Sequence, residues 1–176
     1  PALETCVVAM NDAGRTYDYP GSVEIEIADD QIDSYVRAAA TLNRGRFDVV
    51  SLQHEYGIFG GAAGGHIVEL LKRLTMPVVT TLHTVLAEPS PDQRAVMAEI
   101  IARSARLVVM AQKGRDLLQT IYGVTARMIE VIPHGIPDVP FLGTHDAKAK
   151  LGFSGKTIIL TFGLLSPSKG IETVID

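Results

Sequence analysis

Cysteine is almost absent from this chain of 176 residues, because Cys6 is the only one. A single cysteine excludes an internal disulfide and a thiolate metal cluster, and it predicts a cytoplasmic protein, since reducing compartments hold few disulfides. Long apolar runs are also missing. A transmembrane helix needs roughly 18 or more consecutive apolar residues, so the sequence predicts no transmembrane segment.

An excess of charge of one sign is missing as well. The chain has 16 basic and 20 acidic residues, which leaves a net charge of -4. Without a broad basic field, binding to nucleic acid or to an anionic membrane is disfavoured, whereas a small anionic ligand needs only local charges. Apolar residues make up 47% of the chain, which is enough to offset the entropy cost of folding and predicts a globular protein.

Short apolar runs alternate with amphipathic runs along the chain. This alternation is typical of βα units and therefore predicts an α/β fold with a parallel sheet. Several runs are apolar at consecutive positions, which predicts strands that are covered on both faces. The predicted strands are Glu4–Met10, Val23–Ile27, Phe47–Leu52, Pro77–Leu82, Leu107–Met110, Met128–Ile132 and Thr157–Phe162.

Apolar residues between these runs recur at helical spacing. The third predicted helix has a clear start, because Ser90 can cap it, Pro91 suits its first turn and Gln93 completes a capping box. Gly123 is expected to end the fourth helix. The predicted buried stripes are Ile32, Tyr35, Val36 and Ala39; Ile67, Leu70, Leu71 and Leu74; Val96, Met97, Ile100 and Ile101; and Leu117, Leu118, Ile121 and Tyr122.

A segment rich in proline and glycine, residues 133–143, interrupts this alternation and cannot support a regular element. A short helix over Asp146–Leu151 is expected after it. The chain begins at Pro1 without an initiating Met and stops at Asp176 inside a predicted helix, so we expect a piece of a longer protein, truncated at both ends.

Three of the five histidines follow predicted strands directly: His54, His83 and His134. Ligands of open parallel sheets bind at the carboxyl ends of the strands, and right-handed crossovers place these ends along one rim. The pattern therefore predicts one site lined by these imidazoles. Two other interpretations stay open. In the first, each histidine simply bonds a loop carbonyl or caps a helix; in the second, the three imidazoles with Glu55 hold zinc.

Two loops that join a strand to a helix have compositions suited to polar ligands. In the first, residues 56–65, glycines that include Gly60 and Gly61 permit close approach to an anion or a sugar. In the second, residues 162–170, Lys169 stands at a helix start where backbone donors and the helix dipole would also meet a phosphate. The alternatives are a tight connection for the first loop and an ordinary surface lysine for the second.

Four segments together resemble one known family. They are Phe47–Gly57, Pro77–Thr84, Val131–Pro137 and Phe162–Gly170. In this order and spacing they resemble family 4 glycosyltransferases of the GT-B fold, over nearly the whole chain. The resemblance implies two Rossmann-like domains, each with a doubly wound parallel sheet, that face each other across a cleft. It also implies a retaining, hexosyltransferase-type transfer of a sugar from a nucleotide-diphosphate donor to an acceptor, with no bound metal and no cofactor.

The resemblance divides the chain and assigns site residues. We expect an acceptor-side domain at residues 1–135, a linker at 136–156, and the first strand and helix start of the donor-side domain at 157–176. His83 matches the family histidine that faces the donor sugar, and is the expected catalytic residue. Lys169 matches the lysine that contacts the donor diphosphate, with Gly163 and Ser166 beside it. The residues expected on the acceptor side of the cleft are His54, Glu55, Gly60, Gly61 and His134.

The chain departs from the family pattern in three places. Leu164 stands where the family often has an arginine that contacts phosphate. The family's first strand has no counterpart before Glu4, which predicts a gap in the sheet and self-association through it. The acidic donor motif would lie beyond Asp176, which predicts an inactive fragment of an active parent. A non-catalytic Rossmann-like binding module and a sugar-nucleotide epimerase are the alternative functions.

Overall fold

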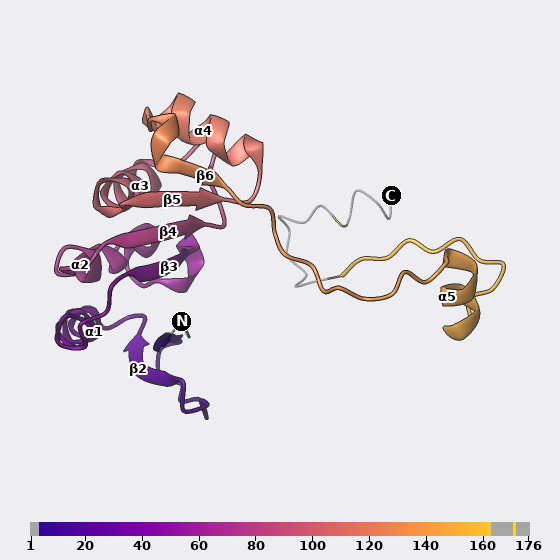
Figure 1. Ribbon diagram of the computed structural model, residues 1–176, viewed down its shortest axis with the longest axis horizontal. Coiled ribbons are helices and arrows are strands. Elements are labelled where there is room, and N and C mark those ends of the chain that lie inside the picture. Colours follow the sequence, from indigo (N-terminus) through magenta and orange to yellow (C-terminus); the bar gives the residue numbers. More distant parts are fainter. Residues whose placement is uncertain (1–3, 163–170, 172–176) are drawn as a thin grey trace. The chain divides into compact units, whose positions relative to one another are not determined.

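The computed structural model describes residues 4–162 and 171 (Figure 1). The chain divides into two compact units, Pro1–His134 and Gly135–Asp176. Nearly all of the regular structure belongs to the first unit. Across the described residues, no helix combines the length and the apolar character that crossing a membrane requires.

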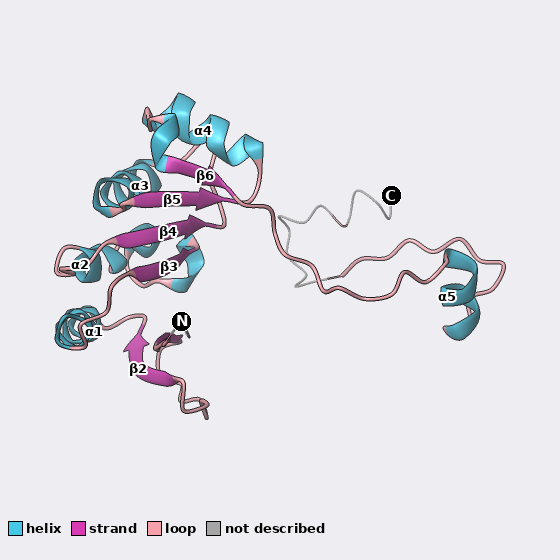
Figure 2. Cartoon of the chain, in the orientation of Figure 1, coloured by secondary structure: helices cyan, strands magenta, loops and turns pink. Residues whose placement is uncertain are grey.

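All strands of the first unit pair in parallel (Figure 2). Strands β1 (Val7–Asn11) and β2 (Val23–Ala28) form a two-stranded sheet. A four-stranded sheet follows in the order β3-β4-β5-β6. Its strands are β3 (Val50–His54), β4 (Val78–Leu82), β5 (Arg106–Val109) and β6 (Ile129–Val131). The prediction of an α/β fold with parallel strands is confirmed.

Helices follow each strand of the first unit from β2 to β5. They are α1 (Ile32–Arg44), α2 (Ile67–Leu71), α3 (Pro91–Arg103) and α4 (Gln112–Tyr122), with 3-10 turns at Tyr56–Ile58, Ala62–Gly64 and Ala126–Met128. The predicted capping box is present, because the Ser90 hydroxyl accepts from Gln93 N and the Gln93 side chain accepts from Ser90 N. Gly123 ends α4 with φ 66°, a left-handed conformation that favours glycine.

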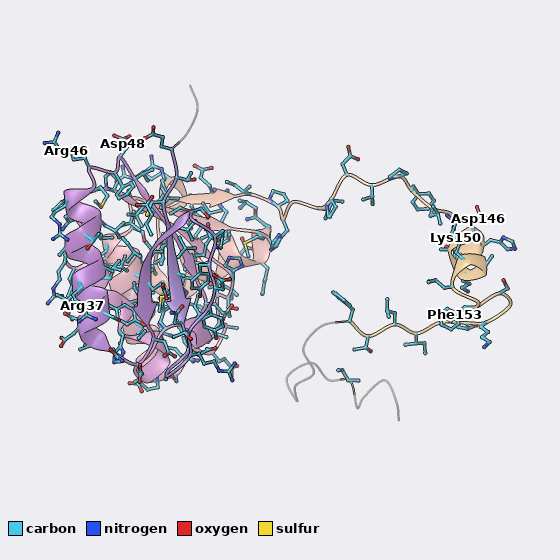
Figure 3. All side chains as sticks on the ribbon, turned by 90° about the horizontal axis from the view of Figure 1, so that it is seen from below. Arg37, Arg46, Asp48, Asp146, Lys150 and Phe153 are labelled. Atoms are coloured by element: carbon cyan, nitrogen blue, oxygen red, sulfur yellow. The ribbon has the colours of Figure 1, made fainter. Side chains whose placement is uncertain are left out.

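Helix α1 buries a different stripe from the one predicted. Ile32, at its first turn, is 45% exposed, whereas Tyr35 and Ala39 are buried. Ser34, Ala38 and Leu42 complete the buried face. On the outer side of α1, Arg37 points away from the core (Figure 3). Small residues at positions 34, 38 and 39 let α1 pack closely on its neighbours.

Strand alternation places the core on one face of the four-stranded sheet. Leu52, Thr80, Leu107 and Ile129 lie side by side in register and are buried. The opposite face carries exposed polar and charged side chains, namely Ser51, Gln53, Arg106 and Glu130. Among the described residues, the side chains that the four-stranded sheet buries therefore lie on one face, whereas Val79, Thr81 and Val108 on the other face are only half-buried. The sequence had predicted strands that are covered on both faces.

The sheet is interrupted between β2 and β3. Among the described strands, β1 and β2 pair only with each other, and β3 pairs only with β4. Ile27 of β2 nevertheless shares one hydrophobic core with Tyr35 and Leu52. The expected gap in the sheet is thus present, and side-chain packing joins the two sheets across it.

The second unit contains α5 (Thr144–Lys150), close to the predicted helix. Figure 3 labels Asp146 and Lys150 on α5 and Phe153 just after it. The strand predicted at residues 157–162 is absent from the described structure, so that prediction is wrong. A strand needs a neighbour that accepts its backbone hydrogen bonds and covers its apolar face. Ile159 is 76% and Leu160 is 80% exposed, and no described strand pairs with them.

Candidate functional site

Two of the three predicted histidines meet at the carboxyl edge of the four-stranded sheet. His83 directly follows β4 and His134 follows β6, and both side chains are exposed. Their ring centroids are 6.2 Å apart. Because β5 lies between β4 and β6, the strand ends bring together residues that are 51 positions apart in the sequence.

Gln53 fixes the orientation of the His83 ring. The Gln53 amide nitrogen donates to the hydroxyls of Ser51, at 3.3 Å, and Thr81, at 3.5 Å. The amide oxygen therefore faces His83, whose Nε2 lies 3.0 Å away. Since the amide oxygen only accepts, Nε2 of His83 carries the proton. With this proton on Nε2, Nδ1 is the ring atom that can accept a hydrogen bond.

Glu55 ties the loop after β3 to the loop after β4. Its carboxylate accepts from the Thr84 hydroxyl at 2.7 Å and from Tyr56 N at 3.2 Å. The side chain also caps the 3-10 turn that begins at Tyr56. Thr84 is the next residue after His83, so the hydrogen bond between Thr84 and Glu55 restrains the backbone next to His83.

The His54 side chain lies inside the protein, whereas the side chains of the other two histidines are exposed. His54 ends β3 on the same face as Leu52 and is 0% exposed. Its ring stacks on Phe59 at 5.8 Å and meets the edge of Tyr56 at 5.1 Å between centroids. Among the described residues, neither ring nitrogen has a hydrogen-bond partner. Burial lowers the pKa of His54 to about 4, partly opposed by the charge of Glu55, so the ring is neutral at ordinary pH.

The glycine-rich loop packs against protein at its two predicted site residues. A Cβ on Gly60 would collide with the carbonyl oxygen of Asp29, and a Cβ on Gly61, at φ 81°, would meet the His66 ring at 2.6 Å. Gly60 N donates to the Tyr35 hydroxyl, which donates in turn to the Asp29 carbonyl. Close approach to neighbouring protein groups therefore accounts for both glycines.

A pocket of about 210 Å³ opens beside His83. It lies where β4 and β5 end and α4 begins, and its walls include Leu82, Val109 and Leu117. Lys113 and Gly114, from the first turn of α4, also line it. The helix has no side-chain cap at Ala111. An ammonium group and a helix N-terminus together favour an anionic group in this pocket.

Gly163, Ser166 and Lys169 lie outside the described residues. Within residues 4–162 and 171, no three His, Cys, Asp or Glu side chains converge to hold a metal ion. The zinc interpretation therefore has no ligand set in this part of the chain.

Comparison with known proteins identifies the family. The model of Glycosyltransferase Family 4 matches residues 15–138, most of the chain. The chain belongs to glycosyltransferase family 4. The family match includes His83, His134 and the whole pocket, and the parallel α/β architecture is that of a Rossmann-like GT-B domain.

Two curated relatives of this family 4 chain carry the same name, D-inositol 3-phosphate glycosyltransferase. The protein from Acidothermus cellulolyticus is 28% identical over 155 residues, which cover 80% of this chain and 33% of the relative. The protein from Jonesia denitrificans is 25% identical over 159 residues, which cover 80% of this chain and 36% of the relative. The chain thus spans about a third of the length of each. No solved structure gives a significant match.

Sequence reasoning assigned no role to Gln53, Thr84 or Lys113. Gln53 and Thr84 were visible as polar neighbours of the strand-end histidines. The signal for Gln53 was strand alternation, since it must face away from Leu52 and His54. No sequence signal marked Lys113, because its place in the pocket depends on how closely α4 approaches β5. Gly114 permits that approach, as a Cβ there would lie 3.1 Å from Val109.

Proposed function

We propose that this chain is part of a retaining glycosyltransferase that moves a sugar from a nucleotide-diphosphate donor to an acceptor. The observation that carries the proposal is the position of His83 in a family 4 chain. Its ring is exposed at the carboxyl edge of the sheet, held by Gln53 and next to a pocket. This edge is where parallel α/β sheets bind ligands.

His83 would act as a hydrogen-bonding group toward the donor sugar. With Nε2–H committed to Gln53, Nδ1 of His83 would accept a hydrogen bond from a sugar hydroxyl. Such a bond fixes the sugar relative to the bond that breaks, and correct positioning is a large part of the rate gain in transfer reactions.

Lys169 would stabilise the departing nucleoside diphosphate. This role rests on the sequence alone, which predicts that Lys169 stands at a helix start after a loop with Gly163 and Ser166. An ammonium group beside backbone donors offsets the negative charge that develops on the leaving group. Since Leu164 supplies no guanidinium, Lys169 would act with the backbone donors of this loop.

The acceptor would enter at the carboxyl edge of the four-stranded sheet, near the loop that follows β3. The names of the two relatives make inositol 3-phosphate the first acceptor to test. Lys113 in the pocket beside His83 suits a hydroxylated anion of this kind. A cytoplasmic location stays a prediction from the single cysteine.

A transfer assay tests the role of His83. Full-length protein would be incubated with radiolabelled sugar nucleotide and inositol 3-phosphate, and the wild type would be compared with His83→Ala. We expect transfer to fall by about 100-fold, because a positioned hydrogen-bonding group is lost from the reacting sugar.

His145→Ala is the control, since His145 is an exposed histidine on α5 to which the proposal assigns no role in transfer. It should transfer sugar like the wild type. Unchanged turnover in His83→Ala would remove His83 from the proposed role. The 176-residue chain alone is expected to give no transfer, because it spans only about a third of the length of the two relatives.

A further inference from the structure

A pair of tyrosines lies in the loop between β1 and β2. The rings of Tyr17 and Tyr19 have centroids 5.7 Å apart and are tilted by 38°. Tyr17 is 41% exposed, and Tyr19 is half-buried beside it. Together they form a small aromatic surface, here called the tyrosine platform, that no part of the proposed transfer mechanism uses.

Hydrogen bonds hold both rings in place. The Tyr17 hydroxyl donates to Asp12 at 2.6 Å, and the Tyr19 hydroxyl donates to Asn11 at 2.7 Å. Asn11, only 8% exposed, donates in turn to Glu26 of β2 at 2.6 Å. The platform is therefore anchored to both strands of the small sheet.

The ends of the loop are fixed as well. Arg15 N donates to the Asp12 carbonyl, and Val23 N donates to the Pro20 carbonyl. These two turns enclose the platform and restrict the backbone that carries it. A surface that is ordered before binding loses little conformational entropy when a ligand arrives.

The chemistry of the platform indicates a ligand with an apolar face and a polar rim. An aromatic face carries negative charge density, so it attracts C–H groups that are slightly positive. A saccharide ring presents such a row of C–H groups on its face and hydroxyl donors at its edge. The carboxylates of Asp12 and Glu26 and the amide of Asn11, which surround the platform, can accept from those hydroxyls.

The platform also lies at the carboxyl end of β1, since Asn11 is the last residue of that strand. This is the end at which parallel α/β sheets bind their ligands. We propose that Tyr17 and Tyr19 form a carbohydrate-binding platform that stacks on the C–H face of a saccharide ring. The proposal goes beyond sugar transfer, because it concerns binding by residues other than His83 and Lys169.

Tyrosine resonances test the proposal directly in the 176-residue chain, which has five tyrosines. With isotope-labelled tyrosine, titration with methyl β-D-glucopyranoside should move the Tyr17 and Tyr19 ring signals until they saturate. Tyr35, at 0% exposure, is an internal control and should not move. A parallel titration with myo-inositol tests a cyclitol ring in place of a pyranose ring. The compound that binds more tightly shows which of the two kinds of ring the platform prefers.

Variants separate stacking from other effects. Tyr17→Leu keeps an apolar side chain without an aromatic face, and should weaken glycoside binding about 5-fold, as read from Tyr19. Tyr17→Phe keeps the ring, and should weaken it by less than about 2-fold. The Tyr35 signal reports whether each variant is folded. If a Tyr17 variant does not fold, Tyr19→Leu is used in its place, and binding is then read from the Tyr17 signal.

The proposal is overturned if no saturable shift occurs, or if Tyr17→Leu binds like the wild type. It is also overturned if glycerol, which has hydroxyls and no ring face, moves the same signals equally, or if choline binds more tightly than the glycosides. These results are independent of the transfer assay. A protein that fails this binding test can still need His83 for transfer. Conversely, a transfer assay that removes His83 from its proposed role would leave glycoside binding by the platform intact.

Discussion

The carboxyl edge of the four-stranded sheet has a buried side and an exposed side, and a histidine stands on each. His54 and His83 are close, because His83 N donates to the His54 carbonyl at 3.0 Å. His54 nevertheless lies under Tyr56 and Phe59 without a partner for its ring nitrogens, whereas His83 is exposed and bonded to Gln53. The difference teaches that the end of a strand is not enough to define a site, because the face of the sheet decides which side chain can meet a ligand.

The largest expected effect on the buried side is a loss of stability in acid. The pKa of His54 is lowered from 6.5 to about 4 in the folded chain. Between these pH values the unfolded chain binds a proton that the folded chain does not, so stability falls as pH falls through this window. The free energy of unfolding should decrease by about 3 kcal/mol from this group.

Urea unfolding at several pH values between 6.5 and 4 measures this decrease. In His54→Leu the group is absent, so the decrease over the same window should be smaller by about 3 kcal/mol. An identical pH profile in the variant would contradict the buried, neutral state of His54. Leucine is chosen because it fills the site without leaving an unpaired polar atom.

On the exposed side, loss of the Gln53 contact should lower activity without loss of stability. Gln53→Ala removes the acceptor that selects the Nε2–H form of His83. We expect transfer by the full-length protein to fall about 10-fold, mostly in kcat, since the imidazole remains but loses its orientation.

Glu130→Ala is a matched control, because Glu130 is exposed on the same face of the sheet. It should keep full activity, and both variants should unfold within about 0.5 kcal/mol of the wild type. Equal losses of activity in the two variants would show that Gln53 does not act through His83.

The smallest expected effect concerns the hydrogen bond between Thr84 and Glu55, which links the loop after β4 to the loop after β3. Thr84→Val removes the hydroxyl that donates to Glu55 at 2.7 Å, and should lower the free energy of unfolding by about 1 kcal/mol. Thr81→Val, whose hydroxyl meets Gln53 only at 3.5 Å, should change it little. Denaturant titration measures both, and equal effects would mean that the bond to Glu55 contributes nothing.

Much of the fold was predictable because its signals are local. The alternation of apolar and amphipathic runs predicts the parallel strands, and the helix ends at Ser90 and Gly123 follow from their own capping chemistry. The burial of His54 was not predicted, because it depends on where the strand ends. The strand expected to end at Leu52 continues to His54, and alternation then turns His54 inward with Leu52.

Other features could not be predicted because they depend on residues far apart in the sequence. Gly60 is required by the carbonyl of Asp29, which lies 31 positions earlier. Lys113 reaches the pocket only because α4 packs closely on β5. The segment 157–162 has the composition of a strand, but composition cannot supply the neighbouring strand that it needs.

The most direct test of the account compares the two histidines in one transfer assay on the full-length protein. The account predicts that His83→Ala loses about 100-fold in transfer, whereas His54→Leu keeps nearly all of it at neutral pH. A chain in which His83→Ala remains active and His54→Leu does not would contradict the assignment of sugar transfer to the exposed side of the sheet edge.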